Sequence, residues 1–119
     1  MDAKHANKLL REERQRIESE LAELRSETGE DGELSHVDQH TADGGTELFD
    51  QERVQSMIER LERELEAIER AVKRVDDGTY GVSIESGEQI PDARLEAVPQ
   101  AERTVEEQAR FEAQYRNSV

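Results

Sequence analysis

The residues with the most evident chemistry are acids gathered in one stretch of the chain. Between Arg25 and Arg53 there is no lysine or arginine, and nine carboxylates lie in this window: Glu27, Glu30, Asp31, Glu33, Asp38, Asp43, Glu47, Asp50 and Glu52. Carboxylates at this density create a field that attracts cations and basic surfaces. Acids in a glycine-containing segment also favour turns by bonding their own backbone, so a purely structural role is the alternative.

Other common chemistries lack their residues. The 119-residue chain contains no cysteine, which excludes disulfides and thiolate metal sites. It has no Ser/His/Asp grouping and no glycine-rich phosphate loop, and its 3% aromatic content leaves little apolar mass for a pocket. We therefore expect neither an enzyme nor a cofactor. His40 is a candidate pH-sensitive or ligand residue, with an ordinary solvated side chain as the alternative.

The overall charge restricts the partners. The net charge is −14, from 30 acids against 16 bases, which argues against binding of nucleic acid and of anionic lipid. No apolar run approaches the ~20 residues of a membrane span, and residues 1–14 have no signal-peptide core. We expect a soluble, cytoplasmic protein that does not bind membranes.

Two long helices are predicted to position the acids. The first covers residues 3–27, and its apolar positions follow a heptad pattern: Ala6, Leu10, Ile17, Leu21 and Leu24. A loop with four glycines follows at 29–45. Thr46 is a candidate N-cap of a second helix to about residue 76, whose apolar positions alternate in steps of four and three: Val54, Ile58, Leu61, Leu65, Ile68, Val72 and Val75. This pattern predicts an antiparallel coiled-coil hairpin over 1–77 with an acidic tip at about 29–45.

The remaining residues, 78–119, are predicted to form a small globule. Residues 80–84 alternate well enough for a short strand, with 89–90 as its return, a turn of helix at 91–95 and a last helix at 104–115. We expect its core to consist of Tyr80, Val82, Ile84, Ile90, Leu95, Val98, Val105 and Phe111. The fold class is mainly α.

Several sequence blocks from residue 37 onward resemble the DksA/TraR family of bacterial transcription factors. The blocks fall in the family's order and spacing, and they are DQHTAD at 38–43, GTELFDQER at 45–53, IERA at 68–71, GTYG at 78–81, SGEQI at 86–90, ARLEAVPQA at 93–101 and EEQ at 106–108. The resemblance covers about two-thirds of the chain.

The resemblance implies both a fold and a partner. It implies a long antiparallel coiled coil carrying a small zinc-finger globule and a C-terminal helix. It also implies that the coiled coil enters the secondary channel of bacterial RNA polymerase and that tip acids act near the catalytic centre. The tip residues so implicated are Asp38, His40, Ala42 and Asp43, with Asp43 the leading candidate.

The chain departs from the family at the zinc ligands. Family members of the usual kind carry two C-x-x-C pairs, whereas the matching positions here are Ser83, Ser86, Thr104 and Glu107. Structural zinc needs four good ligands, mostly Cys or His, so we expect no metal at these positions. The globule is therefore expected to hold together by packing alone.

Two functional hypotheses follow. The first is a monomeric regulator of bacterial RNA polymerase that does not bind DNA, with Arg94 as a possible further polymerase contact. Arg94 could instead pair with a helix acid and lock the globule to the coiled coil. The second hypothesis is a structural or adaptor coiled coil that binds another helical partner or itself. Tip acids matter under the first hypothesis and not under the second.

Overall fold

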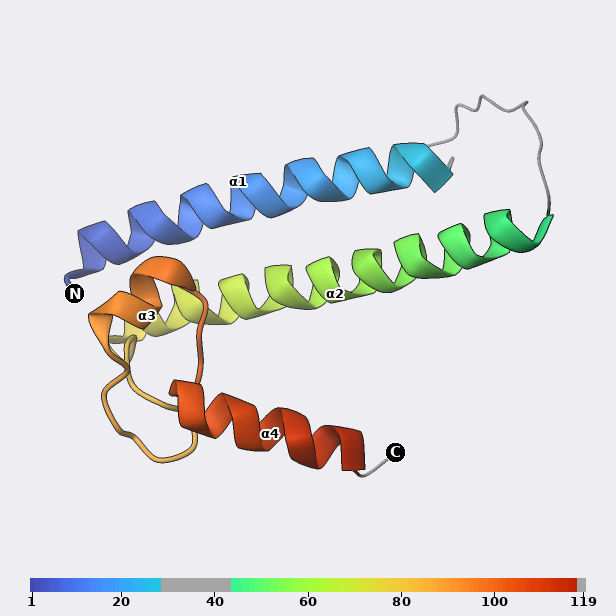
Figure 1. The fold of residues 1–119 in the computed structure, drawn as a ribbon. Helices are drawn as coiled ribbons and strands as arrows, with labels where there is room; N and C mark the ends of the chain where they lie inside the picture. Colours follow the sequence, from blue (N-terminus) through green and yellow to red (C-terminus); the bar gives the residue numbers. More distant parts are fainter. Residues whose placement is uncertain (29–43, 118–119) are drawn as a thin grey trace. The chain divides into compact units, whose positions relative to one another are not determined.

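The computed structural model describes residues 1–28 and 44–117, and it contains four helices there (Figure 1). They are α1 (Ala3–Thr28), α2 (Gly44–Asp77), α3 (Asp92–Ala97) and α4 (Val105–Asn117). Helix α2 begins two residues before Thr46, so the prediction that Thr46 caps it is wrong. No helix in these ranges combines the length and apolarity needed to cross a bilayer. The mainly helical fold predicted from the sequence is confirmed.

The chain divides into two compact units, one of which is Arg14–Leu65. Within this unit, the parts of α1 and α2 run in opposite directions (Figure 1). They bury one apolar stripe from each helix: Ile17, Leu21 and Leu24 from α1, and Val54, Ile58 and Leu61 from α2. Arg25 of α1 also forms an ion pair with Glu62 of α2. The spacing of the buried residues is that of a coiled-coil seam, in which apolar side chains recur every three or four positions.

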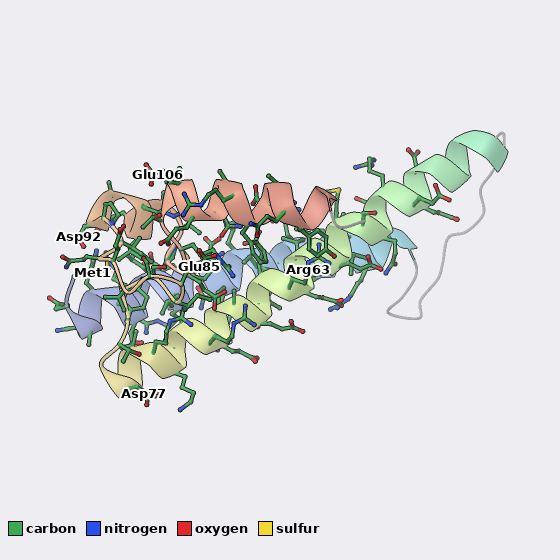
Figure 2. The ribbon with its side chains drawn as sticks, turned by 90° about the horizontal axis from the view of Figure 1, so that it is seen from below. Met1, Arg63, Asp77, Glu85, Asp92 and Glu106 are labelled. Carbon is green, nitrogen blue, oxygen red and sulfur yellow. The ribbon has the colours of Figure 1, made fainter. Side chains whose placement is uncertain are left out.

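The other unit contains Met1–Glu13 and Glu66–Val119. One small apolar cluster of this unit consists of Ile90, Leu95 and Ala101, against which Met1, Tyr80 and Val98 pack. Tyr80 also donates a 2.7 Å hydrogen bond to the Pro99 carbonyl, and burial raises the pKa of its hydroxyl to about 12. Figure 2 shows Met1 and Asp92 at one end of this unit, where the Met1 amino group lies 3.6 Å from the Asp92 carboxylate.

The seam of α2 differs in part from the sequence pattern. Leu65, Val72 and Val75 are only half-buried, whereas Ala71 is fully buried. Ala71 belongs to the unit that also contains residues 78–119, where Arg70 and Arg74 of α2 bond to Glu102, so this part of α2 packs in different surroundings from those of a two-helix seam.

Two further predictions for the globule are wrong. Four of its expected core residues are exposed: Val82, Ile84, Val105 and Phe111. The predicted strand pair is reduced to one isolated antiparallel bridge between Val82 and Gln89 in the described part of the chain. Between the loop after α2 and helix α4, the side chains that are buried are those of Ser83 and Glu107, which bond to each other.

Candidate functional site

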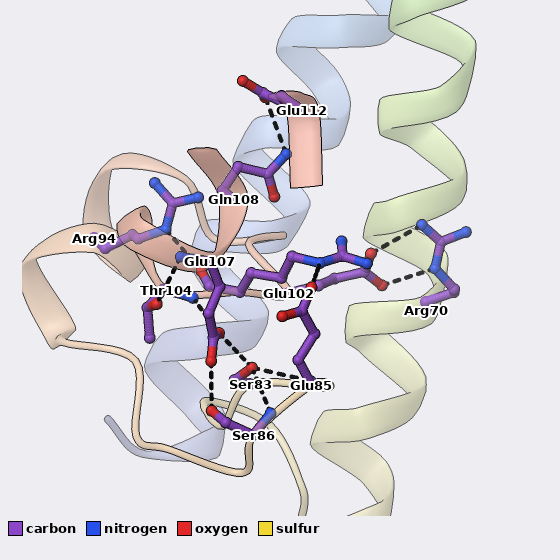
Figure 3. A network of polar contacts seen from close by, with 11 residues as sticks. Arg70, Ser83, Glu85, Ser86, Arg94, Glu102, Thr104, Glu107, Gln108 and Glu112 are labelled. Atoms are coloured by element: carbon purple, nitrogen blue, oxygen red, sulfur yellow. Dashed lines mark hydrogen bonds and ion pairs between the residues drawn. The ribbon is translucent and has the colours of Figure 1, made fainter. Parts of the chain in front are cut away.

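The four positions that correspond to zinc ligands come together in one hydrogen-bonded cluster (Figure 3). Ser83 Oγ donates to Glu107 Oε1 at 2.6 Å, and Ser86 Oγ donates to Glu107 Oε2 at 2.5 Å. The backbone N–H of Thr104 donates to Glu107 Oε1 at 3.0 Å. Ser83, Thr104 and Glu107 are 4%, 7% and 5% exposed, whereas Ser86 is exposed, so three of the four residues are buried and the fourth lies at the surface.

The loop side of the cluster is shaped by Ser83. Its Oγ accepts the backbone N–H groups of Glu85 and Ser86 at 3.0 and 3.2 Å, which folds residues 83–86 into a tight turn. Gly87 completes the turn with a φ of +77°, a conformation that glycine adopts without strain. Serine favours such turns because its short side chain reaches nearby backbone groups. The turn places both serine hydroxyls toward Glu107.

The helix side of the cluster is a capping box at the start of α4. Thr104 Oγ1 accepts the backbone N–H of Glu107 at 3.2 Å, while Glu107 Oε1 accepts the backbone N–H of Thr104. This reciprocal pattern fits a Thr-x-x-Glu sequence at a helix N-terminus. The cap fixes the direction of the Glu107 side chain, so that its carboxylate faces the serine turn.

The hydrogen bonds strongly favour the ionised form of Glu107. The Ser83 and Ser86 hydroxyls and the Thr104 backbone N–H lower the pKa of this carboxyl to about 2, although burial opposes the shift. A carboxylate that accepts several hydrogen bonds is stabilised in its charged form. Glu107 is therefore a buried, permanently charged acceptor at neutral pH.

The residues at these positions do not fit the zinc that the family resemblance implies. Structural zinc takes deprotonated Cys or neutral His ligands, and the cluster offers one carboxylate and three hydroxyls. Both oxygens of that carboxylate already accept hydrogen bonds. Within residues 1–28 and 44–117, no group of three or more His, Cys, Asp or Glu side chains converges as metal ligands would.

A second carboxylate, Glu102, joins the same segment to α2. Arg70 donates two hydrogen bonds to it, at 2.8 and 3.2 Å, and Arg74 donates one at 3.2 Å. Burial alone would raise the pKa of Glu102, but the two arginines outweigh burial and lower it. The bond to Glu102 in turn raises the pKa of Arg70. Sequence reasoning did not single out this cluster.

Arg94 lies on α3 and is half-buried. Its Nε donates a 3.0 Å hydrogen bond to the backbone carbonyl of Arg103, so it ties α3 to the segment that precedes α4. The group that Arg94 Nε binds is therefore a backbone carbonyl rather than the helix acid that the sequence suggested. The four predicted tip residues Asp38, His40, Ala42 and Asp43 lie outside the described residues.

Comparison with known proteins supports the family resemblance. The sequence model of the prokaryotic dksA/traR C4-type zinc finger matches residues 78–113. General stress protein 16O of Bacillus subtilis is 47% identical over 98 residues, which are 81% of this chain and 60% of that protein. The RNA polymerase-binding transcription factor DksA of Caulobacter vibrioides is 35% identical over 108 residues, or 91% of this chain and 68% of that protein.

A solved structure agrees with these relatives. The structure of transcription factor DksA2 from Pseudomonas aeruginosa matches with a TM-score of 0.71 and 25% identity, over 96% of this chain and 85% of that one. The fold and the site define a mainly helical protein with a zinc-finger-like globule. The chain belongs to the DksA/TraR family. It spans only three-fifths of the length of the Bacillus protein.

Proposed function

We propose that this protein regulates transcription by binding bacterial RNA polymerase. Family membership carries the proposal, because the 35% identical relative from Caulobacter vibrioides is named an RNA polymerase-binding transcription factor. In this proposal, residues 1–77 act as a helical hairpin that enters the secondary channel, and residues 78–119 form the globule. Because a hairpin within one chain needs no second copy, the protein acts as a monomer.

The proposed mechanism is electrostatic. The nine acids between Arg25 and Arg53 approach a basic, metal-containing channel, which speeds encounter and makes binding sensitive to salt. Asp43 and Asp38 act near the catalytic centre, with His40 and Ala42 beside them at the tip. The net charge of −14 supports regulation without direct contact to DNA. Arg94 is proposed as an additional contact with the polymerase.

The test replaces Asp38 and Asp43 with Asn. Each substitution lies in a glycine-containing connector and is expected to change the unfolding free energy by less than about 0.5 kcal/mol. The double variant is expected to lose most of its effect in an in vitro transcription titration while still competing for polymerase. A Glu18→Gln/Glu23→Gln variant is the control, since it removes the same charge from exposed positions of α1.

A regulatory effect equal to that of the unmodified protein would overturn the tip mechanism. The adaptor hypothesis would then lead, because it requires intact helix surfaces and no tip acids. Binding of a helical partner that survives the double substitution, together with no binding of polymerase, would establish that alternative.

A further inference from the structure

The positions that correspond to metal ligands keep the spacing of a metal finger although their chemistry has changed. Positions 83 and 86 are separated by two residues, positions 104 and 107 by two, and the pairs by 17. This is the arrangement of two paired-ligand turns around one zinc ion. We infer that the Glu107 carboxylate takes the place of the metal, as the centre that ties the turn at 83–86 to the start of α4. We call this centre the Glu107 hub.

The hub reverses the polarity of a metal site. In a C4 finger, four anionic ligands surround one cation. Here one anion accepts hydrogen bonds from three donors, two from Ser83 and Ser86 of the turn and one from the Thr104 backbone. Hydrogen bonds to an ionised acceptor are roughly twice as strong as neutral ones. The turn and the helix start are thus held by contacts that converge on a single side chain.

The hydrogen bonds of the hub also compensate the Glu107 carboxylate for the water that it loses on burial. A carboxylate that is 5% exposed destabilises the fold unless hydrogen bonds compensate for its lost water. Both of its oxygens are bonded, and the serines that bond it are themselves fixed, because Ser83 Oγ and Ser86 Oγ accept backbone N–H groups of their own turn. The cluster is therefore complete without any added ion.

Other contacts between the same segments lie outside the hub. The Ile84 backbone N–H donates to the Glu102 carbonyl at 2.9 Å, and Arg103 forms a 2.7 Å ion pair with the half-exposed Glu85. These contacts keep the segments near each other if the hub is lost. A hub variant is therefore expected to loosen the globule rather than unfold the whole chain.

The first experiment compares Glu107→Gln with Glu106→Gln. The amide at position 107 keeps the shape of the side chain but removes its charge. Its NH2 group also faces the hydroxyl and N–H groups that donate hydrogen bonds to the carboxylate. Glu106 lies in the same first turn of α4, is exposed, and points away from the loop side where Glu85 lies (Figure 2), so it is a matched control. The two tyrosines, Tyr80 and Tyr115, lie in the globule and the chain has no tryptophan, so the tyrosine band of the near-UV circular dichroism spectrum reports on this region.

The expected result is a fall of at least about 4 °C in the tyrosine-detected melting temperature for Glu107→Gln. Glu106→Gln and addition of a strong zinc chelator are expected to leave that temperature unchanged. Equal melting temperatures for the two glutamine variants would overturn the inference. So would a chelator-induced loss of the tyrosine signal in the unmodified protein.

The second experiment restores the metal chemistry at all four positions. The quadruple variant Ser83→Cys/Ser86→Cys/Thr104→Cys/Glu107→Cys is expected to bind one cobalt(II) ion and to show the absorption of tetrahedral thiolate coordination. Its tyrosine signal is expected to depend on the metal. A quadruple variant that takes up no cobalt overturns the equivalence between the hub and a metal site. Neither experiment depends on binding of polymerase, so failure here leaves the proposed function untouched.

Discussion

Among the described residues of Arg14–Leu65, every buried side chain is apolar, whereas the globule buries Ser83, Gln100, Thr104 and Glu107 beside a small apolar core. The first region is stabilised by the burial of apolar side chains that recur every three or four residues along each helix. The second is stabilised by a few directed polar bonds that converge on two carboxylates. The globule has few large apolar side chains, so directed hydrogen bonds and ion pairs stabilise its fold. The paired helices are stabilised mainly by the apolar surface that they bury.

The largest expected effect is in the seam. Leu61 is 2% exposed and Leu65 is half-buried, although both lie on α2 four residues apart. Leu61→Ala is expected to lower the unfolding free energy by about 2–4 kcal/mol, as for a fully buried leucine. Leu65→Ala is expected to lower it by about 1–2 kcal/mol, because less apolar area is removed from contact. Urea unfolding followed by far-UV circular dichroism measures both, and equal effects would contradict the burial difference.

The next effect concerns the arginine-bound carboxylate. Glu102→Gln leaves Arg74, which is 16% exposed, without a charged partner, so we expect a loss of about 1–3 kcal/mol. Lys73→Ala breaks an exposed ion pair with Asp77 and is expected to change stability by about 0.5 kcal/mol or less. Denaturant unfolding of the two variants side by side tests whether the globule depends on buried charge more than on surface charge. A larger loss in the Lys73 variant would reverse that conclusion.

A fall in pH is expected to affect the globule more than the seam, because no carboxylate is buried among the described residues of Arg14–Leu65. The pKa of Glu107 is lowered from 4.5 to about 2 in the folded protein, so its contribution to stability is fully present above pH 4.5. As the pH falls from 4.5 toward 2, the unfolded chain binds a proton that the folded chain does not, and this contribution is lost. In this pH range, the Glu107→Gln variant is expected to take up about one proton fewer on unfolding than the unmodified protein does.

The measurement is a series of tyrosine-detected unfolding curves between pH 2.5 and 5, with Glu106→Gln as control. The proton uptake is obtained from the slope of the unfolding free energy against pH. An unchanged slope in the Glu107 variant would mean that this carboxyl titrates alike in the folded and unfolded states.

A smaller effect than that of Leu61→Ala or Glu102→Gln is expected at the surface of α4. The Arg103 guanidinium lies 3.9 Å from the centre of the Phe111 ring, which is 39% exposed. Phe111→Leu is expected to lower stability by about 0.5–1 kcal/mol, the usual range for an exposed cation–π contact. A double-mutant cycle with Arg103→Gln isolates the pair, and a coupling energy near zero would show that the ring contributes only its apolar area.

The helices were largely predictable because repetition is visible in sequence. Ile58 and Leu61 lie where the heptad places them, and the predicted ends of the helices agree with the structure to within a few residues. Leu65 and Val72 were predicted less well, because the exact buried stripe depends on helix twist and on the partner surface. Neither property is visible in the spacing of one helix.

The globule was less predictable because its bonds depend on where two distant segments meet. Val82 and Ile84 alternate as in a strand, yet the bonds of Ser83 fold the backbone into a turn and leave both apolar side chains exposed. Glu107 was recognised only as a replaced ligand. A visible signal for its structural role is the Thr-x-x-Glu pattern beginning at Thr104, which marks a capping box, but nothing local indicates that the serines would reach the same carboxylate.

Because the Glu107 hub is part of the polypeptide, folding of the globule depends on the medium differently from folding of a domain that needs a metal ion. The stability of a fold that needs a free ion rises with the logarithm of that ion's concentration, by mass action. Glu107 is linked to Ser83 by the intervening polypeptide and is therefore present at a fixed effective concentration, whatever the medium contains. Closing of the globule is consequently a unimolecular event, and the contribution of this contact to its equilibrium constant does not depend on the concentration of free zinc.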